Sequence, residues 1–255
     1  MLNQFILTPF FLDEPMPGLE VLMEHNWLMN KPHLPEGDPQ KRMSVTHRVL
    51  SDFVEASICQ GVCPVSVAGD CCTAIGVLAG LQRSGIEPYL MWFDAHGDFN
   101  TWDTTLSGFL GGMPLAMLVG RGEQRMPGSV GLQSIPEEDV LLTDARDLDP
   151  GEKIALESSK VFHVKDVEEL FTFELPNRPI YVHFDTDVID PGEAPAMNYT
   201  ASNGPSSDAL KAIFHHIAQT ERIVAVSVST WNPYLDGDGS TQAVCKGALE
   251  FLLEA

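Results

Sequence analysis

Residues 89–98 read Tyr-Leu-Met-Trp-Phe-Asp-Ala-His-Gly-Asp, an apolar run that ends in two carboxylates and an imidazole at alternating positions. A second apolar run ends in Asp-Thr-Asp at residues 185–187. Alternate residues of an extended chain point to the same side, so one pocket can collect five side chains: Asp94, His96, Asp98, Asp185 and Asp187. Four carboxylates give this pocket a charge of about −4, which one divalent cation, or two that share carboxylates, would neutralise. The two segments therefore predict a metal site.

The size and composition of the whole chain indicate one α/β domain. It has 255 residues, 44% of them hydrophobic, and no low-complexity or Pro/Gly/Ser-rich linker divides it, so we expect a single domain over residues 1–255. No apolar stretch approaches the roughly 18 residues that span a membrane, and residues 1–11 lack the basic start of a signal peptide. We expect a cytoplasmic protein whose five cysteines are thiols.

The charge of the chain limits its partners. Fifteen Lys and Arg stand against 36 Asp and Glu, a formal net charge of −21. Such a field repels phosphate backbones and anionic lipid, so we expect neither a nucleic-acid nor a membrane partner. Metal ions or a positively charged small molecule fit it better.

Short apolar runs alternate with amphipathic stretches, which predicts a three-layer α/β/α fold around a mainly parallel sheet. Strands are expected at residues 5–9, 64–68, 89–93, 140–143, 161–164, 180–184 and 223–229. Helices are expected at residues 45–58, 72–84, 112–119, 167–171, 207–219 and 241–254. The Pro-rich segment 15–42 reads as irregular. Both acidic segments follow strand ends, where parallel sheets bind ligands.

Two more segments belong to the same predicted edge of the sheet. Gly69-Asp70-Cys71 follows the strand at 64–68, so Cys71 is a candidate metal ligand. A buried apolar role for this thiol is equally plausible, since free cysteine is among the most buried residue types. Residues 100–112, directly after the first acidic motif, form a loop rich in hydroxyl groups that could clamp a substrate.

These motifs together resemble the ureohydrolase superfamily, which includes arginase, agmatinase and formimidoylglutamase. The resemblance covers residues 65–236. It is carried, in the order and spacing of that family, by Asp-Ala-His-Gly-Asp-Phe-Asn at 94–100, Arg-Asp-Leu-Asp-Pro-Gly-Glu at 146–152, Phe-Asp-Thr-Asp at 184–187 with Asp190-Pro191, and Asn232-Pro233.

The resemblance implies an arginase-like fold with two Mn²⁺ ions and a bridging hydroxide that attacks a guanidinium or amidine carbon. It implies that Asp94 and Asp185 bridge the ions, that Cys71 and Asp98 complete one site, and that His96 and Asp187 complete the other. Where this chain has Cys71 the family has histidine. A thiolate favours Zn²⁺ or Fe²⁺, so a different ion or partial occupancy is the alternative there.

The chain departs from the family at the expected substrate pocket. Gly111 stands where arginases have a proton-shuttle histidine, Phe109 where they have an asparagine, and Thr230 where they have a glutamate that pairs with the guanidinium. His183 replaces a small hydroxyl residue and could either assist the site or be an ordinary core histidine. With the shuttle position altered, Asp98 is the best remaining proton carrier.

Other positions match the part of the family that holds an amino acid. Asn100, Thr105 and Ser107 match contacts to an α-carboxylate, although Asn100 and Ser107 could be plain turn residues. Three acidic residues match positions near the α-amine of the substrate in that family: Asp147, Asp149 and Glu152. These residues could instead start a helix.

The loss at Thr230 favours a less basic headgroup than that of arginine, because an unpaired buried cation is costly. The resemblance thus implies a metal-dependent hydrolase of a guanidino or amidino compound such as Nω-hydroxyarginine, which releases urea or a substituted urea. A formimidoyl or amide hydrolase and a non-catalytic metal-binding homologue are the alternatives. Family members usually assemble, so a homo-oligomer is expected.

Overall fold

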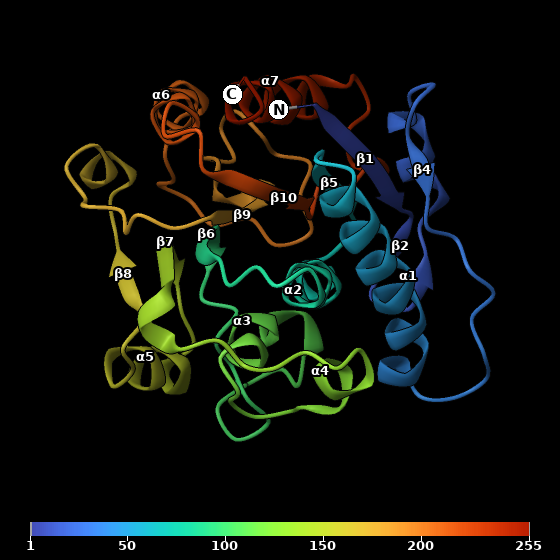
Figure 1. Ribbon diagram of the computed structural model, residues 1–255. Coiled ribbons are helices and arrows are strands. Elements are labelled where there is room, and N and C mark those ends of the chain that lie inside the picture. Colours follow the sequence, from blue (N-terminus) through green and yellow to red (C-terminus); the bar gives the residue numbers. More distant parts are fainter. Residues whose placement is uncertain (1, 255) are drawn as a thin grey trace.

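Eight parallel strands form the central sheet of the computed structural model, which describes residues 2–254 (Figure 1). Each neighbouring pair in it is parallel. The order across the sheet is β4 (Leu28–Met29), β1 (Asn3–Thr8), β5 (Cys63–Ala68), β10 (Ile223–Ser229), β9 (Ile180–Asp185), β6 (Tyr89–His96), β7 (Val140–Asp147) and β8 (Phe162–Val164). A short antiparallel pair, β2 (Phe10–Phe11) and β3 (Glu14–Pro15), lies outside it.

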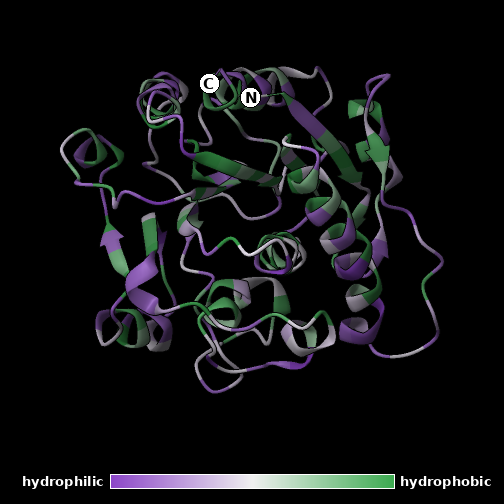
Figure 2. Ribbon diagram, in the orientation of Figure 1, coloured by the Kyte–Doolittle hydropathy of each residue, from purple (hydrophilic) through white to green (hydrophobic). Residues whose placement is uncertain are grey.

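Helices cover both faces of the sheet and leave two separate cores. One face carries α6 (Ser207–Ala218) and α7 (Ser240–Leu252), and the other carries α1 (Pro39–Cys59), α2 (Ala74–Arg83), α3 (Pro114–Leu118), α4 (Arg125–Ser129) and α5 (Pro150–Glu157). Figure 2 shows the hydrophobic character of the inner strands, most clearly β10, and the hydrophilic outer turns of the helices. This arrangement confirms the predicted α/β/α class.

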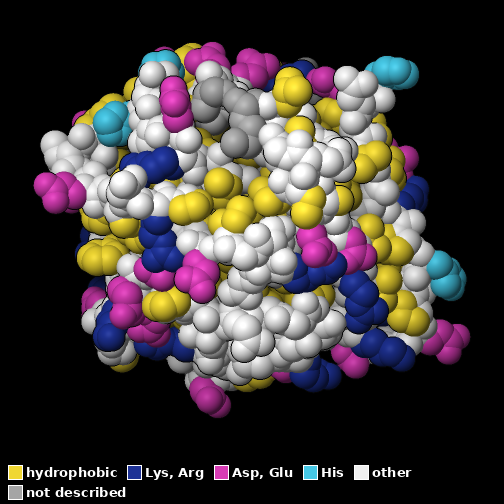
Figure 3. Space-filling model, in the orientation of Figure 1, with side chains coloured by type: hydrophobic (Ala, Val, Ile, Leu, Met, Phe, Trp, Pro, Cys, Tyr) yellow, Lys and Arg dark blue, Asp and Glu magenta, His cyan; other side chains and the backbone are white. Residues whose placement is uncertain are grey.

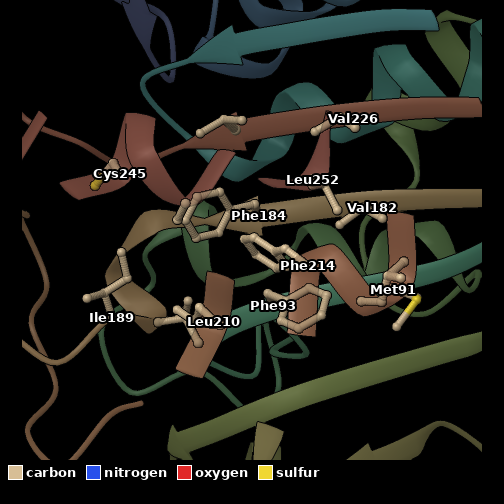
Figure 4. Close-up of a cluster of buried hydrophobic side chains, with 14 of the residues drawn as sticks. Met91, Phe93, Val182, Phe184, Ile189, Leu210, Phe214, Val226, Cys245 and Leu252 are labelled. Carbon is tan, nitrogen blue, oxygen red and sulfur yellow. The ribbon is translucent and has the colours of Figure 1, made fainter. Parts of the chain in front are cut away.

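The strand β6 shows how its sequence supplies both cores. Met91 and Phe93 point into the core beneath α6 and α7, whereas Leu90 and Trp92 point into the core beneath α1 and α2. The ring of Phe214 in α6 meets Phe93 edge-on at 5.0 Å between centroids (Figure 4). Because both faces of the strand are buried, its apolar run is nearly continuous.

Several predicted elements differ from the structure. Segment 15–42 is not wholly irregular, because it holds a 3₁₀ turn η1 (Pro17–Leu22) and the edge strand β4. Helix α1 begins at Pro39, earlier than predicted, because Asp38 caps it by accepting from the N–H of Lys41. The segment predicted as a helix at 167–171 is a 3₁₀ turn, η5 (Val167–Phe171). Helix α4 was not predicted, since five residues carry too little periodicity.

The strand order places the predicted site on five adjacent strands. Strands β5, β10, β9, β6 and β7 are neighbours in the sheet, and all run in parallel. The segments that leave their carboxyl ends contain Cys71, Thr230, Asp187, Asp98 and Asp149, respectively. Parallel topology therefore gathers residues from positions 71 to 230 at one edge.

The exterior agrees with the charge of the chain. On the face drawn in Figure 3, many Lys and Arg side chains lie beside Asp and Glu, and several Lys and Arg gather at the lower right. Within residues 2–254, no helix is both long enough and apolar enough to cross a bilayer.

Candidate active site

Three overlapping groups of ligand-type side chains lie at the carboxyl edge of the sheet. In each group the potential ligand atoms lie within 4.8 Å of one another. The groups are Cys71 with Asp94 and Asp98, Asp94 with His96 and Asp187, and Cys71 with His183 and Asp185. The structure thus brings together all six residues that the sequence suggested as metal ligands, and adds His183.

Strand alternation explains only part of this convergence. Asp94 and His96 both belong to β6, as predicted from an extended chain. At Asp98, however, φ is +49°, so the chain turns there and the turn carries the third side chain to the site. Asp187 lies in the 3₁₀ turn η6 (Thr186–Val188). Its N–H donates to Oδ1 of Asp185 at 2.9 Å. The expectation of uniform alternation was therefore wrong for these two residues.

The cluster is buried and strongly self-repelling. Burial and then the charges of Asp94 and Asp185 raise the pKa of Asp98 well above its usual range. Burial and then Asp187 and Asp94 do the same for the pKa of Asp185. Removal of carboxylates from water, together with like charges nearby, favours the protonated form. A bound cation would reverse both effects.

His96 is the partly exposed member of the cluster. Its Nδ1 lies 3.2 Å from Oδ2 of Asp187 and 3.4 Å from Oδ1 of Asp94. Burial lowers the pKa of His96, but the hydrogen bonds and charges of those two carboxylates outweigh it and raise the pKa to about 12. In the absence of a metal, a proton on His96 therefore supplies part of the positive charge that this cluster needs.

One buried oxygen indicates that the cluster suits a metal. Oδ2 of Asp98 is buried and has no hydrogen-bond partner within residues 2–254. An orphaned carboxylate oxygen is costly unless something binds it. Trp92 Nε1 donates to Oδ2 of Asp94 at 3.0 Å and so orients that carboxylate. The donor set, mainly carboxylate oxygens with one imidazole, fits hard divalent cations.

Cys71 begins a chain of buried polar contacts that leads away from the pocket. Its Sγ lies 3.1 Å from Oγ of Ser229, and that hydroxyl lies 3.4 Å from Nε2 of His183. The other ring nitrogen of His183 lies 2.7 Å from Oγ of Ser227. The imidazole also stacks on Trp92, with 3.7 Å between ring centroids, and burial lowers its pKa to about 3. His183 is therefore a hydrogen-bonded core histidine whose edge reaches the ligand cluster.

A pocket of about 380 Å³ opens onto this cluster. It is lined by all eight residues that the sequence suggested for substrate binding: Asn100, Thr105, Ser107, Phe109, Asp147, Asp149, Glu152 and Thr230. It is also lined by Asp70 and Gly112, which lie in the two segments predicted at this edge, and by Phe11 and Tyr199, which sequence reasoning did not assign to the site. Phe11 follows β1 closely and so could have been placed at this edge, whereas no motif surrounds Tyr199.

Asp147, Asp149 and Glu152 form an acidic wall of the pocket, which is hydrogen-bonded to the segment that follows β6. Glu152 accepts hydrogen bonds from the N–H of Phe99 at 2.8 Å and of Asp149 at 3.2 Å. Asp149 is the N-cap of α5, so both residues do serve helix initiation, and both still face the pocket. Burial raises the pKa of Glu152 to about 7. Asn100 donates to Oδ2 of Asp149 at 3.2 Å, and this hydrogen bond joins the acidic wall to the hydroxyl-rich loop 100–112.

The hydroxyl loop keeps a donor free for a ligand. Oγ1 of Thr105 accepts from the N–H of Gly108 at 3.1 Å, and Oγ of Ser107 accepts from the N–H of Phe109 at 3.2 Å. The two hydroxyl oxygens lie 3.5 Å apart, so one proton can be shared between them and the other remains available, since a hydroxyl both donates and accepts. Thr230, across the pocket, has φ +83°, a conformation that β-branched residues rarely adopt. Such outliers concentrate at functional sites.

The family model of the Arginase family matches residues 19–253. The chain belongs to the arginase family. Members of this family among its relatives are amidinohydrolases, so the chain is a hydrolase of C–N bonds other than peptide bonds. The resemblance found in the motifs is confirmed over nearly the whole chain.

The chain is also similar to individual relatives and solved structures of this family. The chain is 28% identical to an N(omega)-hydroxy-L-arginine amidinohydrolase of Streptomyces lavendulae, over 95% of this chain and 82% of that protein. It is 30% identical to an arginase of Bacillus subtilis (strain 168), over 74% of this chain and 68% of that protein. The crystal structure of Entamoeba histolytica arginase in complex with L-ornithine has the same fold, with a TM-score of 0.85, 20% identity and full coverage of both chains.

Proposed function

We propose that this arginase-family hydrolase acts on a modified arginine, with Nω-hydroxyarginine the best candidate, and releases urea or a substituted urea. The observation that carries the proposal is the pocket itself. It joins an acidic ligand cluster to hydroxyl donors and an acidic wall, while Thr230 stands where a carboxylate would pair with an unmodified guanidinium. The similarity to the Streptomyces lavendulae amidinohydrolase supports the same substrate class.

The metal centre that we propose is binuclear, with Mn²⁺ as the first candidate. Asp94 and Asp185 would be shared, His96 and Asp187 would complete one position, and Cys71 with Asp98 the other. The thiolate makes Zn²⁺, Fe²⁺ or partial occupancy the alternative at this second position. When bound, a pair of divalent cations activates water as a nucleophile at neutral pH.

The protein's own groups position the substrate and move protons. Thr105 and Ser107 would donate their hydroxyl protons to an α-carboxylate, helped by Asn100. The acidic wall formed by Asp147, Asp149 and Glu152 would attract the α-ammonium group. Asp98 would carry a proton to the departing amine, because this residue lines the pocket and Gly111 provides no side chain for the task.

A product panel tests the proposal. Purified protein is loaded separately with Mn²⁺, Zn²⁺ or Fe²⁺ and incubated with Nω-hydroxyarginine, arginine, agmatine and formimidoylglutamate, and the products are identified by mass spectrometry. We expect ornithine and hydroxyurea from Nω-hydroxyarginine, faster than ornithine from arginine, and no turnover in Asp98→Asn. If all four compounds stay intact with every metal, the proposal is wrong.

A second candidate substrate class has one observation in its favour. A formimidoyl or amide compound lacks the third nitrogen of a guanidinium, so it has one group fewer to pair with residue 230, where Thr230 provides no carboxylate. Preferential release of formamide from formimidoylglutamate in the same panel would select this alternative.

A further inference from the structure

Three aromatic rings from separate segments meet on one wall of the pocket. The centroids of Phe109 and Tyr199 are 5.1 Å apart at an interplanar angle of 47°, and those of Phe109 and Phe11 are 6.2 Å apart at 19°. Both spacings lie within the range of favourable aromatic pairs. All three rings line the pocket that contains the ligand cluster. We call Phe11, Phe109 and Tyr199 the aromatic wall.

The position of Phe109 depends on the absence of a side chain at residue 111. A Cβ atom on Gly111 would lie 2.4 Å from Cε1 and 2.5 Å from Cζ of the Phe109 ring. Gly111 does not have a positive φ, so its backbone conformation alone does not require glycine. The ring therefore fills the space that a side chain at 111 would occupy, and it extends the aromatic wall inward.

The pocket lining is also acidic, and His96 of the ligand cluster is the one basic side chain in the lining found within residues 2–254. The pocket-lining carboxyl groups outside the ligand cluster are those of Asp70, Asp147, Asp149 and Glu152, and no Lys or Arg belongs to the lining found within residues 2–254. The lining of this pocket therefore offers a cation both aromatic faces and carboxylates. Aromatic faces attract planar cations and stack on planar groups.

We propose that the aromatic wall is a specificity surface for a cationic guanidino compound that carries a flat, unsaturated group. The inference rests on the proposed function only for the guanidino class of the ligand, and goes beyond it by assigning Phe11 and Tyr199 to recognition and by predicting that flat substituents are preferred. The rings would contact the flat group, and the carboxylates would attract the cation. Both interactions can be detected by binding, without turnover.

The test compares two probes of equal charge and similar size. Benzylguanidinium has a flat ring, and cyclohexylmethylguanidinium has a saturated one. Isothermal titration of the Mn²⁺-loaded protein is expected to show benzylguanidinium binding about 2- to 10-fold more tightly, the range given by stacking of one aromatic pair. In Phe109→Leu and, independently, in Tyr199→Leu, the affinity ratio is expected to fall to about 1.

The control variant is Phe171→Leu, which changes a half-exposed ring on η5 outside the pocket. It should keep the full affinity ratio. A ratio of 1 in the unmodified protein, or a ratio that survives both substitutions in the aromatic wall, would overturn the inference. Because the readout is a binding ratio, it stays distinct from the product panel: the ratio can fail while Nω-hydroxyarginine is hydrolysed, and hydrolysis can fail while the ratio is present.

Discussion

The thiol of Cys71 donates a hydrogen bond to Oδ2 of Asp185 across 2.7 Å, which joins two segments 114 residues apart in the chain. Burial and then the charges of Asp185, Asp98 and Asp94 raise the pKa of this thiol well above its usual range. Without a cation the thiol therefore keeps its proton. A metal ligated by this thiolate would have to displace that proton, so binding there should depend on pH.

Substitution of Cys71 by histidine is expected to increase Mn²⁺ content. Imidazole is a harder ligand than thiolate and does not prefer softer ions, so it suits Mn²⁺ better. Elemental analysis after equilibration with Mn²⁺ should give close to two ions per chain in Cys71→His and fewer in the native protein.

Cobalt provides a direct readout of the Cys71 thiolate: a near-ultraviolet sulfur-to-cobalt absorption should be present in the native protein and absent in Cys71→Ser. The same change at Cys245, a buried thiol outside the pocket, serves as the control. Equal metal content and equal spectra in all variants would remove Cys71 from the metal centre.

Neutralisation of Asp98 is expected to stabilise the metal-free protein and to abolish its response to Mn²⁺. Asp98→Asn removes one of the crowded buried charges, so the free energy of unfolding in the presence of a chelator should rise by about 1–3 kcal/mol. The native protein should gain about 2.7 kcal/mol when Mn²⁺ is present at a hundred times its dissociation constant, and the variant much less. Urea unfolding with and without Mn²⁺ measures both effects. Asp103→Asn, at an exposed carboxylate outside the pocket, should behave like the native protein.

Glu152 is expected to make stability depend on pH. Burial raises its pKa from 4.5 to about 7, so the folded protein binds a proton there that the unfolded chain has lost. The stabilising contribution is fully present below pH 4.5 and is lost as pH rises through 7. In metal-free protein, Glu152→Gln should become more stable relative to the native protein by up to about 3 kcal/mol between these limits. Urea unfolding at both pH values tests this, with the exposed Glu157 of the same helix, changed to Gln, as the control. A difference between Glu152→Gln and native that does not vary with pH would contradict the assignment.

The sequence allowed the parallel sheet and the convergence of six ligand-type side chains to be predicted, because both depend on local signals. The run at 89–93 is apolar on both faces, and that property alone indicates a buried parallel strand. The substitution of Cys71 for histidine was readable because the flanking strand and glycine place it. The turns at Asp98 and Asp187 could not be read from alternation, since they depend on backbone angles that several residue types tolerate.

The aromatic wall could not have been found from the sequence. Phe11 follows β1 and Tyr199 stands 12 residues after Asp187, but neither belongs to a metal motif, and each is an ordinary packing residue by its local pattern. Only the folded loops show that their rings meet Phe109. The close approach of Gly111 to the Phe109 ring could not be predicted either. Residues two apart in a loop can point in any relative direction, so only the folded structure shows this contact.

Restoration of a carboxylate at position 230 is expected to shift substrate preference towards arginine. Thr230 is buried and lines the pocket, and glutamate there would pair with a full guanidinium charge. Loss of one partner of a buried ion pair costs about 3–5 kcal/mol, so even partial recovery should raise kcat/KM for arginine, relative to Nω-hydroxyarginine, at least about tenfold in Thr230→Glu. Thr230→Gln adds the length without the charge and should not change the ratio. Parallel kinetics of the three proteins with both substrates provide the measurement, and an equal shift in both variants would show that size rather than charge is responsible.

The contact between Gly111 and Phe109 predicts an energetic coupling that a four-protein cycle can measure. Gly111→His places a Cβ where only 2.4 Å separates it from the Phe109 ring, so this single change should be strongly destabilising. Phe109→Asn removes the ring, and the double variant should therefore be more stable than additivity allows, by about 1–3 kcal/mol in urea unfolding. Gly112 gives a matched control, since a Cβ there meets only Nδ2 of Asn100 at 4.0 Å. The corresponding cycle with Gly112→His should be additive to within about 0.5 kcal/mol. Additivity in the Gly111 cycle would show that the ring moves aside freely, and that an imidazole and Phe109 can share the pocket.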